Sequence, residues 1–379
     1  MPYYDQKQYN MNFRRWLVFT FLLLGTNCVF GQSQKISFTA ADWKFANDDH
    51  RIETFKGKEC LYLGPGYALN EASFKNGVVD FDIAFSEKRQ FSGFFFRRVD
   101  DKNYEDFYLR PHQSGNPDAN QYTPVFNGLS GWQLYHGEDY GMPFKYRFDE
   151  WMHVRLVIVE NRMEVYIDDM EKPLIYVPQL KRDIVAGGFG FKTGRNPVRI
   201  ANLQVEHTDN AQLHHAPKVF PVADKGTIMQ WMVSNTVAPN EIIQNTSWKP
   251  EELPVSQWNV LESEYNGIAN LARVADRTPE KNAVLAKVTI ESERDQIKQF
   301  DFGYSDTVHL YCNGQLLFAG NNRYMTRDYR YLGTIGYFES VFLPLKKGEN
   351  EIWMVVTENF GGWGVKGKFD KMEGLTIKK

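Results

Sequence analysis

One polar segment of the chain, residues 103–136, carries the residue types that could bind or cleave a polar ligand. It contains the sequence NYEDFYLRPHQSGNPDANQYTPVFNGLSGWQLYH. We expect a strand followed by a long loop, and long loops on a rigid scaffold often hold binding sites. Because side chains alternate between the two sides of a strand, Tyr108 and Arg110 are expected on the same side. His112 falls on that side too if the strand continues so far. Trp132 adds a flat ring against which an apolar ligand face can stack.

The binding candidates have hydrogen-bonding or aromatic side chains, and all but one lie in this segment. They are Arg97, Tyr108, Arg110, His112, Gln121, Asn127, Trp132 and Gln133. Amide and guanidinium groups form paired hydrogen bonds with hydroxyl groups, so this set suits a hydroxyl-rich ligand such as a sugar. The alternative is an ordered loop whose polar groups satisfy one another.

Hydrolysis of a glycosidic bond would require a pair of carboxylates, about 5 Å apart in retaining enzymes and further apart in inverting ones. Asp80 and Asp82 share one face of an expected strand, and Glu105 is expected on a neighbouring strand. The catalytic candidates are therefore Glu105, His112, Asp80 and Asp82, and paired aspartates with a purely structural role are the alternative.

No cofactor is expected, although calcium is one alternative. Asp100-Asp101 and Asp168-Asp169 offer carboxylate oxygens, the ligands that calcium prefers. Both pairs fall at expected hairpin turns, where Asp is common for conformational reasons. His214-His215 lacks a third ligand nearby, so a zinc site is not expected.

The elements that must position these residues are short strands. Residues 78–85 alternate, with Val79, Phe81 and Ile83 on one face and the two aspartates on the other. Similar segments recur at short spacing: Phe91–Arg97, Phe107–Arg110, Val154–Val159, Met163–Ile167, Gly187–Phe191 and Val198–Leu203. Many short strands without a lasting helical period predict a sandwich or barrel.

A second β-rich unit is expected after residues 208–221, which are polar and contain two prolines. The segment Thr227–Val233 is its expected first strand, residues 238–258 are expected to be loops, and Asn313-Gly314 predicts a hairpin turn. We therefore predict domains at residues 35–207 and 222–379 joined by a linker at 208–221.

Composition is that of a folded, aromatic-rich protein. The 379 residues include 15% Phe, Trp and Tyr, which favours strands and supplies rings for core packing or sugar stacking. Net charge is −3 and the cations are spread along the chain, which argues against a nucleic-acid binder.

The first 31 residues are typical of an export signal. Arg14 and Arg15 precede a short apolar run, and Gly31-Gln32 suits signal peptidase cleavage. A lipoprotein with a lipid attached to Cys28 is the less favoured alternative. The run is too short to span a bilayer, and no membrane span is expected elsewhere. We predict an exported protein, periplasmic, on the cell surface or secreted, in which Cys60 and Cys312 are buried thiols.

The stretch from Gly77 to Leu203 resembles concanavalin A-like lectin and glucanase domains, in particular the 3-keto-disaccharide hydrolase or laminarinase-like branch. The residues that carry this resemblance are Asn76–Asp82, Ser92–Arg97, Asn103–Glu105, Trp151–Leu156 and Val165–Asp168. The resemblance implies a jelly-roll sandwich that handles sugars. The Glu-x-Asp-x-x-Glu strand of the glucanases is absent. The keto-disaccharide branch implies lyase-type chemistry instead, in which a proton is abstracted beside a carbonyl group with His112 or His136 as a candidate base.

The second unit resembles galactose-binding-like sandwich domains, through Val308–Gly314, Leu343–Asn350 and Gly361–Gly364. The fold prediction is therefore all-β, with two antiparallel β-sandwiches, both jelly rolls. The predicted function is recognition of a carbohydrate by the first sandwich. A glycoside hydrolase or lyase and a structural or adhesive surface protein are the alternatives, and the sequence predicts no oligomeric state.

Overall fold

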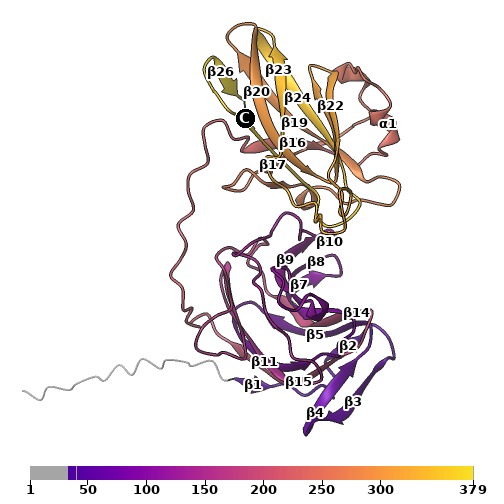
Figure 1. Cartoon of the computed structure of the whole chain (residues 1–379), viewed down its shortest axis with the longest axis vertical. Helices are drawn as coiled ribbons and strands as arrows, with labels where there is room; N and C mark the ends of the chain where they lie inside the picture. The colour runs from indigo at the N-terminus through magenta and orange to yellow at the C-terminus, as the bar shows by residue number, and fades with distance from the viewer. Residues whose placement is uncertain (1–32, 40, 379) are drawn as a thin grey trace, which may run out of the picture. The chain divides into compact units, whose positions relative to one another are not determined.

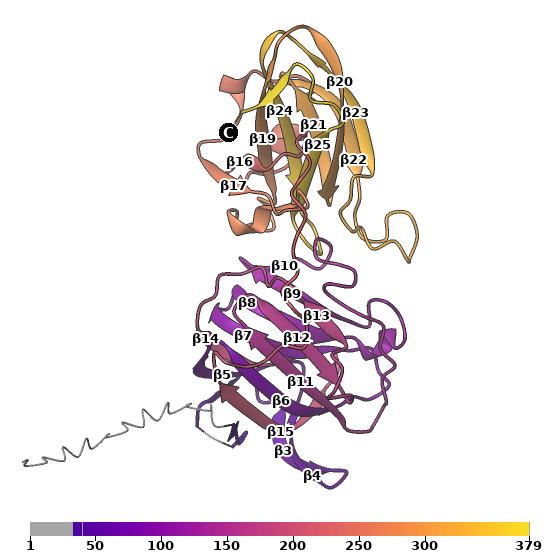
Figure 2. The same cartoon turned by 90° about the vertical axis from the view of Figure 1, so that its left-hand side faces the viewer.

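The computed structural model describes residues 33–39 and 41–378, and its named strands pair antiparallel in four sheets (Figures 1 and 2). The all-β prediction is confirmed. The predicted export signal and Cys28 lie outside the described residues. No helix among the described residues is both long and apolar enough to cross a membrane.

The first sandwich, residues 34–207, consists of two sheets. The first sheet has the order β13 (Ile175–Val177), β12 (Arg162–Ile167), β11 (Met152–Val159), β6 (Gly77–Ala84), β15 (Val198–His207), β4 (Lys58–Leu63) and β3 (His50–Phe55), with β1 (Gln34–Lys35) paired to β15. The second sheet has the order β10 (Leu129–Ser130), β9 (Asn120–Phe126), β8 (Asn103–Leu109), β7 (Phe91–Asp100), β14 (Gly187–Gly194), β5 (Gly66–Phe74) and β2 (Trp43–Phe45).

Alternation along each strand determines which residues fill the space between these two sheets. Val79, Phe81 and Ile83 of β6 are buried in one core with Phe94 and Phe96 of β7, as the sequence pattern predicts for β6. Burying a Phe or Ile side chain contributes about 1.5–3 kcal/mol, so this alternation sets the register of the strands.

Strand β8 is the element that matters most for the site. Phe107 and Leu109 point into the core, and Glu105 is also buried on that side, bonded to Tyr122 of the core. Asp106 and Tyr108 therefore point to the outer face of the second sheet, the face turned away from the core.

The second sandwich, residues 230–377, consists of the other two sheets. The third sheet has the order β17 (Trp258–Glu262), β16 (Gln230–Ser234), β19 (Ala283–Ser292), β24 (Gly348–Thr357), β21 (Thr307–Cys312) and β22 (Gln315–Asn321), with β26 (Leu375–Ile377) paired to β19. The fourth sheet has the order β18 (Ala269–Asn270), β25 (Gly364–Phe369), β20 (Gln296–Ser305) and β23 (Glu339–Leu345). Phe300 and Phe302 of β20 pack with Val284 and Ala286 of β19 in their core.

Short helices and one strand depart from the predicted pattern. The expected loop in residues 103–136 contains η1 (Pro111–Gln113) and the seven-residue strand β9, and residues 238–258 hold α1 (Asn240–Ile243) and η2 (Pro250–Glu252). A further turn, η3, covers Leu271–Arg273. Strand β20 was not predicted, although Phe300, Phe302 and Tyr304 recur at every second position, as in a half-buried strand.

Hydrogen bonds connect the two sandwiches, and the described residues from 33 to 378 belong to one compact unit. The Gln133 N–H donates to Gly361 O at 2.8 Å, and the Tyr135 hydroxyl donates to Glu264 at 2.6 Å. Residues 208–221 contain no helix or strand. The proposed domain boundaries remain predictions. Cys60 and Cys312 are buried thiols, as predicted.

Candidate functional site

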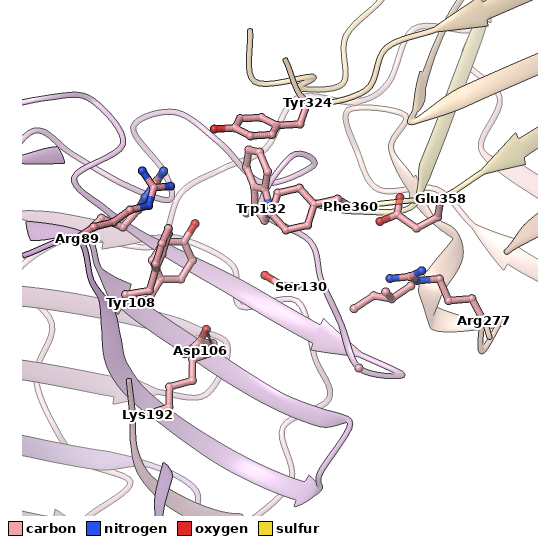
Figure 3. A pocket seen from close by; sticks show the side chains of 15 residues that line it. Arg89, Asp106, Tyr108, Ser130, Trp132, Lys192, Arg277, Tyr324, Glu358 and Phe360 are labelled. Atoms are coloured by element: carbon pink, nitrogen blue, oxygen red, sulfur yellow. Dashed lines mark ion pairs between the residues drawn. The ribbon is translucent and has the colours of Figure 1, made fainter. Parts of the chain in front are cut away.

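A cavity of about 370 Å³ lies on the outer face of the second sheet and is lined by both sandwiches (Figure 3). Strands β7, β8, β10 and β14 supply its floor, and loops of the second sandwich supply one wall. The lining residues used below are Arg89, Phe91, Asp106, Tyr108, Arg110, Ser130, Trp132, Lys192, Arg277, Tyr324, Glu358 and Phe360.

The floor contains an ion pair between two strands of the second sheet. Lys192 Nζ of β14 lies 2.5 Å from Asp106 Oδ2 of β8, and Asp106 is 1% exposed. Burial raises the pKa of Asp106 despite the opposing effect of Lys192. Burial lowers the pKa of Lys192, but the Asp106 carboxylate outweighs this effect and raises it overall. The second carboxylate oxygen, Asp106 Oδ1, is buried and has no hydrogen-bond partner.

Arg110 and Tyr108 continue the floor next to this pair. Arg110 Nη1 donates to Asp118 Oδ2 at 2.8 Å, and its guanidinium lies 5.3 Å from the centre of the Phe91 ring. The Arg110 Nε atom is buried without a partner. The Tyr108 hydroxyl donates to Gln121 Oε1 at 2.8 Å, which holds its ring upright over the sheet.

Three aromatic rings form a wall of the cavity. Trp132 meets Tyr324 with its centroid at 5.9 Å and Phe360 at 5.7 Å, both in edge-to-face geometry. Tyr324 and Phe360 come from the second sandwich, and Figure 3 shows the three rings gathered on one side of the cavity. Such edge-to-face contacts are each worth about 0.5–1.5 kcal/mol, so the rings hold one another in place.

A carboxyl group from the second sandwich completes the lining. Glu358 follows β24 and is fully buried, and its Oε2 has no hydrogen-bond partner. Burial, reinforced by the neighbouring Asp306 carboxylate, raises the pKa of Glu358 to about 8. Arg277 lines the cavity on the same side (Figure 3), and its Nε is also buried without a partner.

Three of the predicted binding residues line this cavity, namely Tyr108, Arg110 and Trp132. The 103–136 segment therefore lies at the cavity.

Three further candidates support the site without lining it. Gln121 accepts from Tyr108 and donates to Trp132 O at 2.9 Å, so it connects floor and wall. Asn127 donates to Ala272 O at 2.9 Å, and Gln133 donates to Leu332 O at 2.7 Å. The last two join the first sandwich to the second.

The remaining candidates of the second sheet are directed elsewhere. Arg97 is buried, donating to Lys75 O at 2.8 Å and to Asn76 Oδ1 at 2.9 Å. His112 lies against Phe91, with centroids 4.9 Å apart, and does not line the cavity.

Glu105 lies on the core side of β8. It accepts from the Tyr122 hydroxyl at 2.7 Å and from the Arg182 N–H at 3.2 Å, so it fastens the loop around Arg182 to the core.

Asp80 and Asp82 lie on the first sheet, on its solvent side, and bind cations there. His153 contacts both, through Nδ1 to Asp82 at 2.8 Å and Nε2 to Asp80 at 3.0 Å. Lys58 and Asn202 also donate to Asp82. These hydrogen bonds hold the pKa of Asp82 down at about 2 against its partial burial. The hydrogen bonds that His153 donates to the two carboxylates raise the pKa of His153 to about 9. The carboxylates of Asp80 and Asp82 thus take part in a structural hydrogen-bond network on the first sheet and lie outside the cavity.

The possible calcium ligands bond to their own turns. Asp100 accepts from the Lys102 N–H at 2.8 Å, and Asp169 accepts from the Glu171 N–H at 2.9 Å. Among the described residues, no three His, Cys, Asp or Glu side chains gather where they could hold a metal ion. His136 is exposed at the domain contact, 3.5 Å from Ile335 O, and lies outside the cavity.

Several lining residues were missed by the sequence interpretation. Asp106 shares the parity of Tyr108 and Arg110 on β8, a signal that the period of two already carries. Lys192, Arg277 and Glu358 have no local signal, since only sheet order and packing bring them to β8. Tyr324 and Gly361 come from loops of the second sandwich and also line the cavity.

Comparisons with known proteins find distant structural likeness. No family model matches the chain, and no curated protein matches it. Among solved structures, the carbohydrate-binding module CBM66 from Bacillus subtilis is 17% identical, with a TM-score of 0.35, over 44% of this chain and 95% of that one. The Bacillus licheniformis beta-glucanase is 11% identical, with a TM-score of 0.34, over 47% and 98%.

A glycosyl hydrolase family protein from Mycobacterium fortuitum is 13% identical, with a TM-score of 0.30, over 46% of this chain and 98% of that one. Likeness at these identities and TM-scores identifies neither the family nor the ligand of this chain. The concanavalin A-like and galactose-binding-like assignments therefore remain predictions.

Proposed function

We propose that this chain is an exported protein that binds a carbohydrate in the cavity between Tyr108 and Trp132. The observation that carries the proposal is the combination of stacking rings with unpaired buried polar atoms. Asp106 Oδ1, Arg110 Nε, Arg277 Nε and Glu358 Oε2 all belong to lining residues and lack a partner among the described residues.

Unpaired buried polar groups cost about 1–3 kcal/mol each, so a ligand that supplies hydrogen bonds recovers that free energy. A sugar offers both donors and acceptors through its hydroxyl groups and an apolar ring face to Trp132. These two properties together match the cavity lining better than they match a purely apolar ligand.

A glycan array followed by isothermal titration calorimetry tests the proposal. Trp132→Ala is expected to weaken binding of the recognised glycan about five- to tenfold, since one stacking contact is worth about 1–1.5 kcal/mol. Trp151→Ala is the matched control, because Trp151 is also half-buried on the first sandwich but lies outside the cavity. Equal affinity of both variants and the parent protein would reject the cavity as the binding site.

A second candidate function, cleavage of the bound saccharide, is favoured by the two carboxyl groups in the lining. Glu358 retains its proton near neutral pH because of its raised pKa, as a general acid must, and the second carboxyl group, that of Asp106, lies 2.5 Å from Lys192. Release of new reducing ends or unsaturated products, abolished in Glu358→Gln while glycan binding persists, would establish this enzyme function. Binding without any product would reject it.

A further inference from the structure

The cavity contains more cationic than anionic side chains. Arg89, Arg110, Lys192 and Arg277 all line it. Two of them are neutralised locally, because Arg110 pairs with Asp118 at 2.8 Å and Lys192 pairs with Asp106 at 2.5 Å.

The other two cations have no such partner. Within residues 33–39 and 41–378, neither Arg89 nor Arg277 forms an ion pair, and Arg277 Nε is buried without a hydrogen-bond partner. Arg89 is exposed at the cavity rim, where its guanidinium lies 5.5 Å from the centre of the Phe91 ring. Figure 3 places Arg89 and Arg277 on opposite sides of the cavity, with Trp132 between them.

The remaining carboxyl group does not neutralise this excess. Glu358 is fully buried beside Asp306, which raises its pKa to about 8, so it is mainly protonated at neutral pH. The Asp306 carboxylate accepts the Asn359 and Phe360 N–H groups, both at 2.8 Å, and does not line the cavity. The lining therefore carries a net positive charge at neutral pH.

We infer that the ligand is an acidic saccharide, whose carboxylate or sulfate groups bind Arg277 and Arg89 while a sugar ring stacks on Trp132. The guanidinium fork matches the two oxygens of a carboxylate or sulfate, and such charge-assisted bonds are stronger than neutral ones. A nucleic acid is disfavoured, since the whole chain is acidic with a net charge of −3 and has no basic stripe. This inference rests on the proposed carbohydrate function and specifies its ligand.

The test uses the purified protein and matched pairs of acidic and neutral polysaccharides. The pairs are polygalacturonate with its methyl ester, glucuronoxylan with unsubstituted xylan, and chondroitin sulfate with its desulfated form. We expect the acidic member of one pair to bind at least tenfold more tightly than the neutral member. We also expect the affinity to fall several-fold between 50 mM and 300 mM salt.

Variants identify the residues responsible. Arg277→Gln and Arg89→Gln are each expected to reduce the preference for the acidic member, measured as the ratio of the two affinities within a pair, at least fivefold. Arg294→Gln is the matched control, an exposed arginine far along the chain in the turn between β19 and β20. Thermal unfolding of each variant verifies that it is folded.

The outcomes separate the two proposals. Selective binding of uronates alone, or of sulfated chains alone, supports the inference and identifies the acidic group. Equal binding of acidic and neutral members, or unchanged selectivity in both Arg variants, overturns the inference and leaves the carbohydrate function standing. Failure to bind any saccharide, on this panel and on the glycan array, rejects both.

Discussion

Lys192 of β14 reaches across strand β7 to bind Asp106 of β8, at 2.5 Å between Nζ and Oδ2. Lys192 is registered opposite Gly93 of β7, and Gly93 is registered opposite Tyr108 of β8. Because Gly93 has no side chain, the lysine stem can cross the intervening strand there. The resulting ion pair sets the charge and shape of the cavity floor.

Removing one partner of this ion pair is expected to destabilise the protein. Asp106→Asn leaves the Lys192 ammonium without its carboxylate, and we expect a loss of about 2–4 kcal/mol in the free energy of unfolding, since Lys192 keeps some contact with solvent. The double variant Asp106→Leu with Lys192→Met is expected to lose less than the single variant. Urea denaturation measures both, and a single-variant loss below about 0.5 kcal/mol would contradict a stabilising role.

Gly93 is expected to tolerate no side chain. An added Cβ would lie 2.1 Å from Phe107 O, which belongs to the neighbouring strand and cannot move independently. Gly93→Ala is therefore expected to cost at least about 2 kcal/mol and to weaken ligand binding. Gly194→Ala in β14 is the control, because the nearest atom to its added Cβ is Phe91 O at 3.9 Å, and it should change stability by less than about 0.5 kcal/mol.

The Asp80–His153–Asp82 network predicts a loss of stability at alkaline pH. Hydrogen bonds that His153 donates to Asp80 and Asp82 raise its pKa from 6.5 to about 9 in the folded protein. The protonated imidazole thus stabilises the fold fully below about pH 6.5, and this contribution disappears as pH rises to about 9. Thermal unfolding across this window should show the decline in the parent protein.

The same decline is expected to be absent from His153→Gln, which cannot become charged. Arg155 and Lys58 also contact these carboxylates, at 2.8 Å and 2.7 Å, and are the same in both proteins, so the comparison isolates the effect of His153. An identical pH profile in His153→Gln and the parent would show that the network does not titrate in this way.

Glu358 predicts a separate pH dependence at the cavity. Its folded pKa of about 8 lies above its unfolded value of 4.5, so the unfolded state loses its proton first and stability falls as pH rises from about 4.5 to 8. The groups facing it are Asp306, which reinforces the shift, and Arg277, which opposes it.

Glu358→Gln is expected to be more stable than the parent at pH 8, by about 1–3 kcal/mol, and to lose most of the decline above pH 4.5. Denaturant unfolding at pH 5 and pH 8 measures this difference. A variant less stable than the parent at both pH values would show that the carboxyl group makes a favourable contact that glutamine cannot replace.

Much of the strand pattern could be predicted from the sequence, because alternation is encoded by adjacent residues. The inward face of β6 and the outward direction of Tyr108 and Arg110 both follow from the period of two. The same parity places Glu105 on the core side and Asp106 on the cavity side, although only Glu105 was chosen as a candidate. The strand period alone therefore identifies Asp106, and not Glu105, as the acidic residue that faces the cavity.

Only the tertiary structure decided which residues complete the cavity. Lys192, Arg277 and Glu358 are distant in sequence from β8, and sheet order, register and the packing of one sandwich on the other bring them to it. The sequence by itself determined the strands and which side chains face the core, since these depend on local periodicity and burial of apolar groups. The pairing of distant strands depends on the free energy of the whole fold, and no local pattern of residues encodes it.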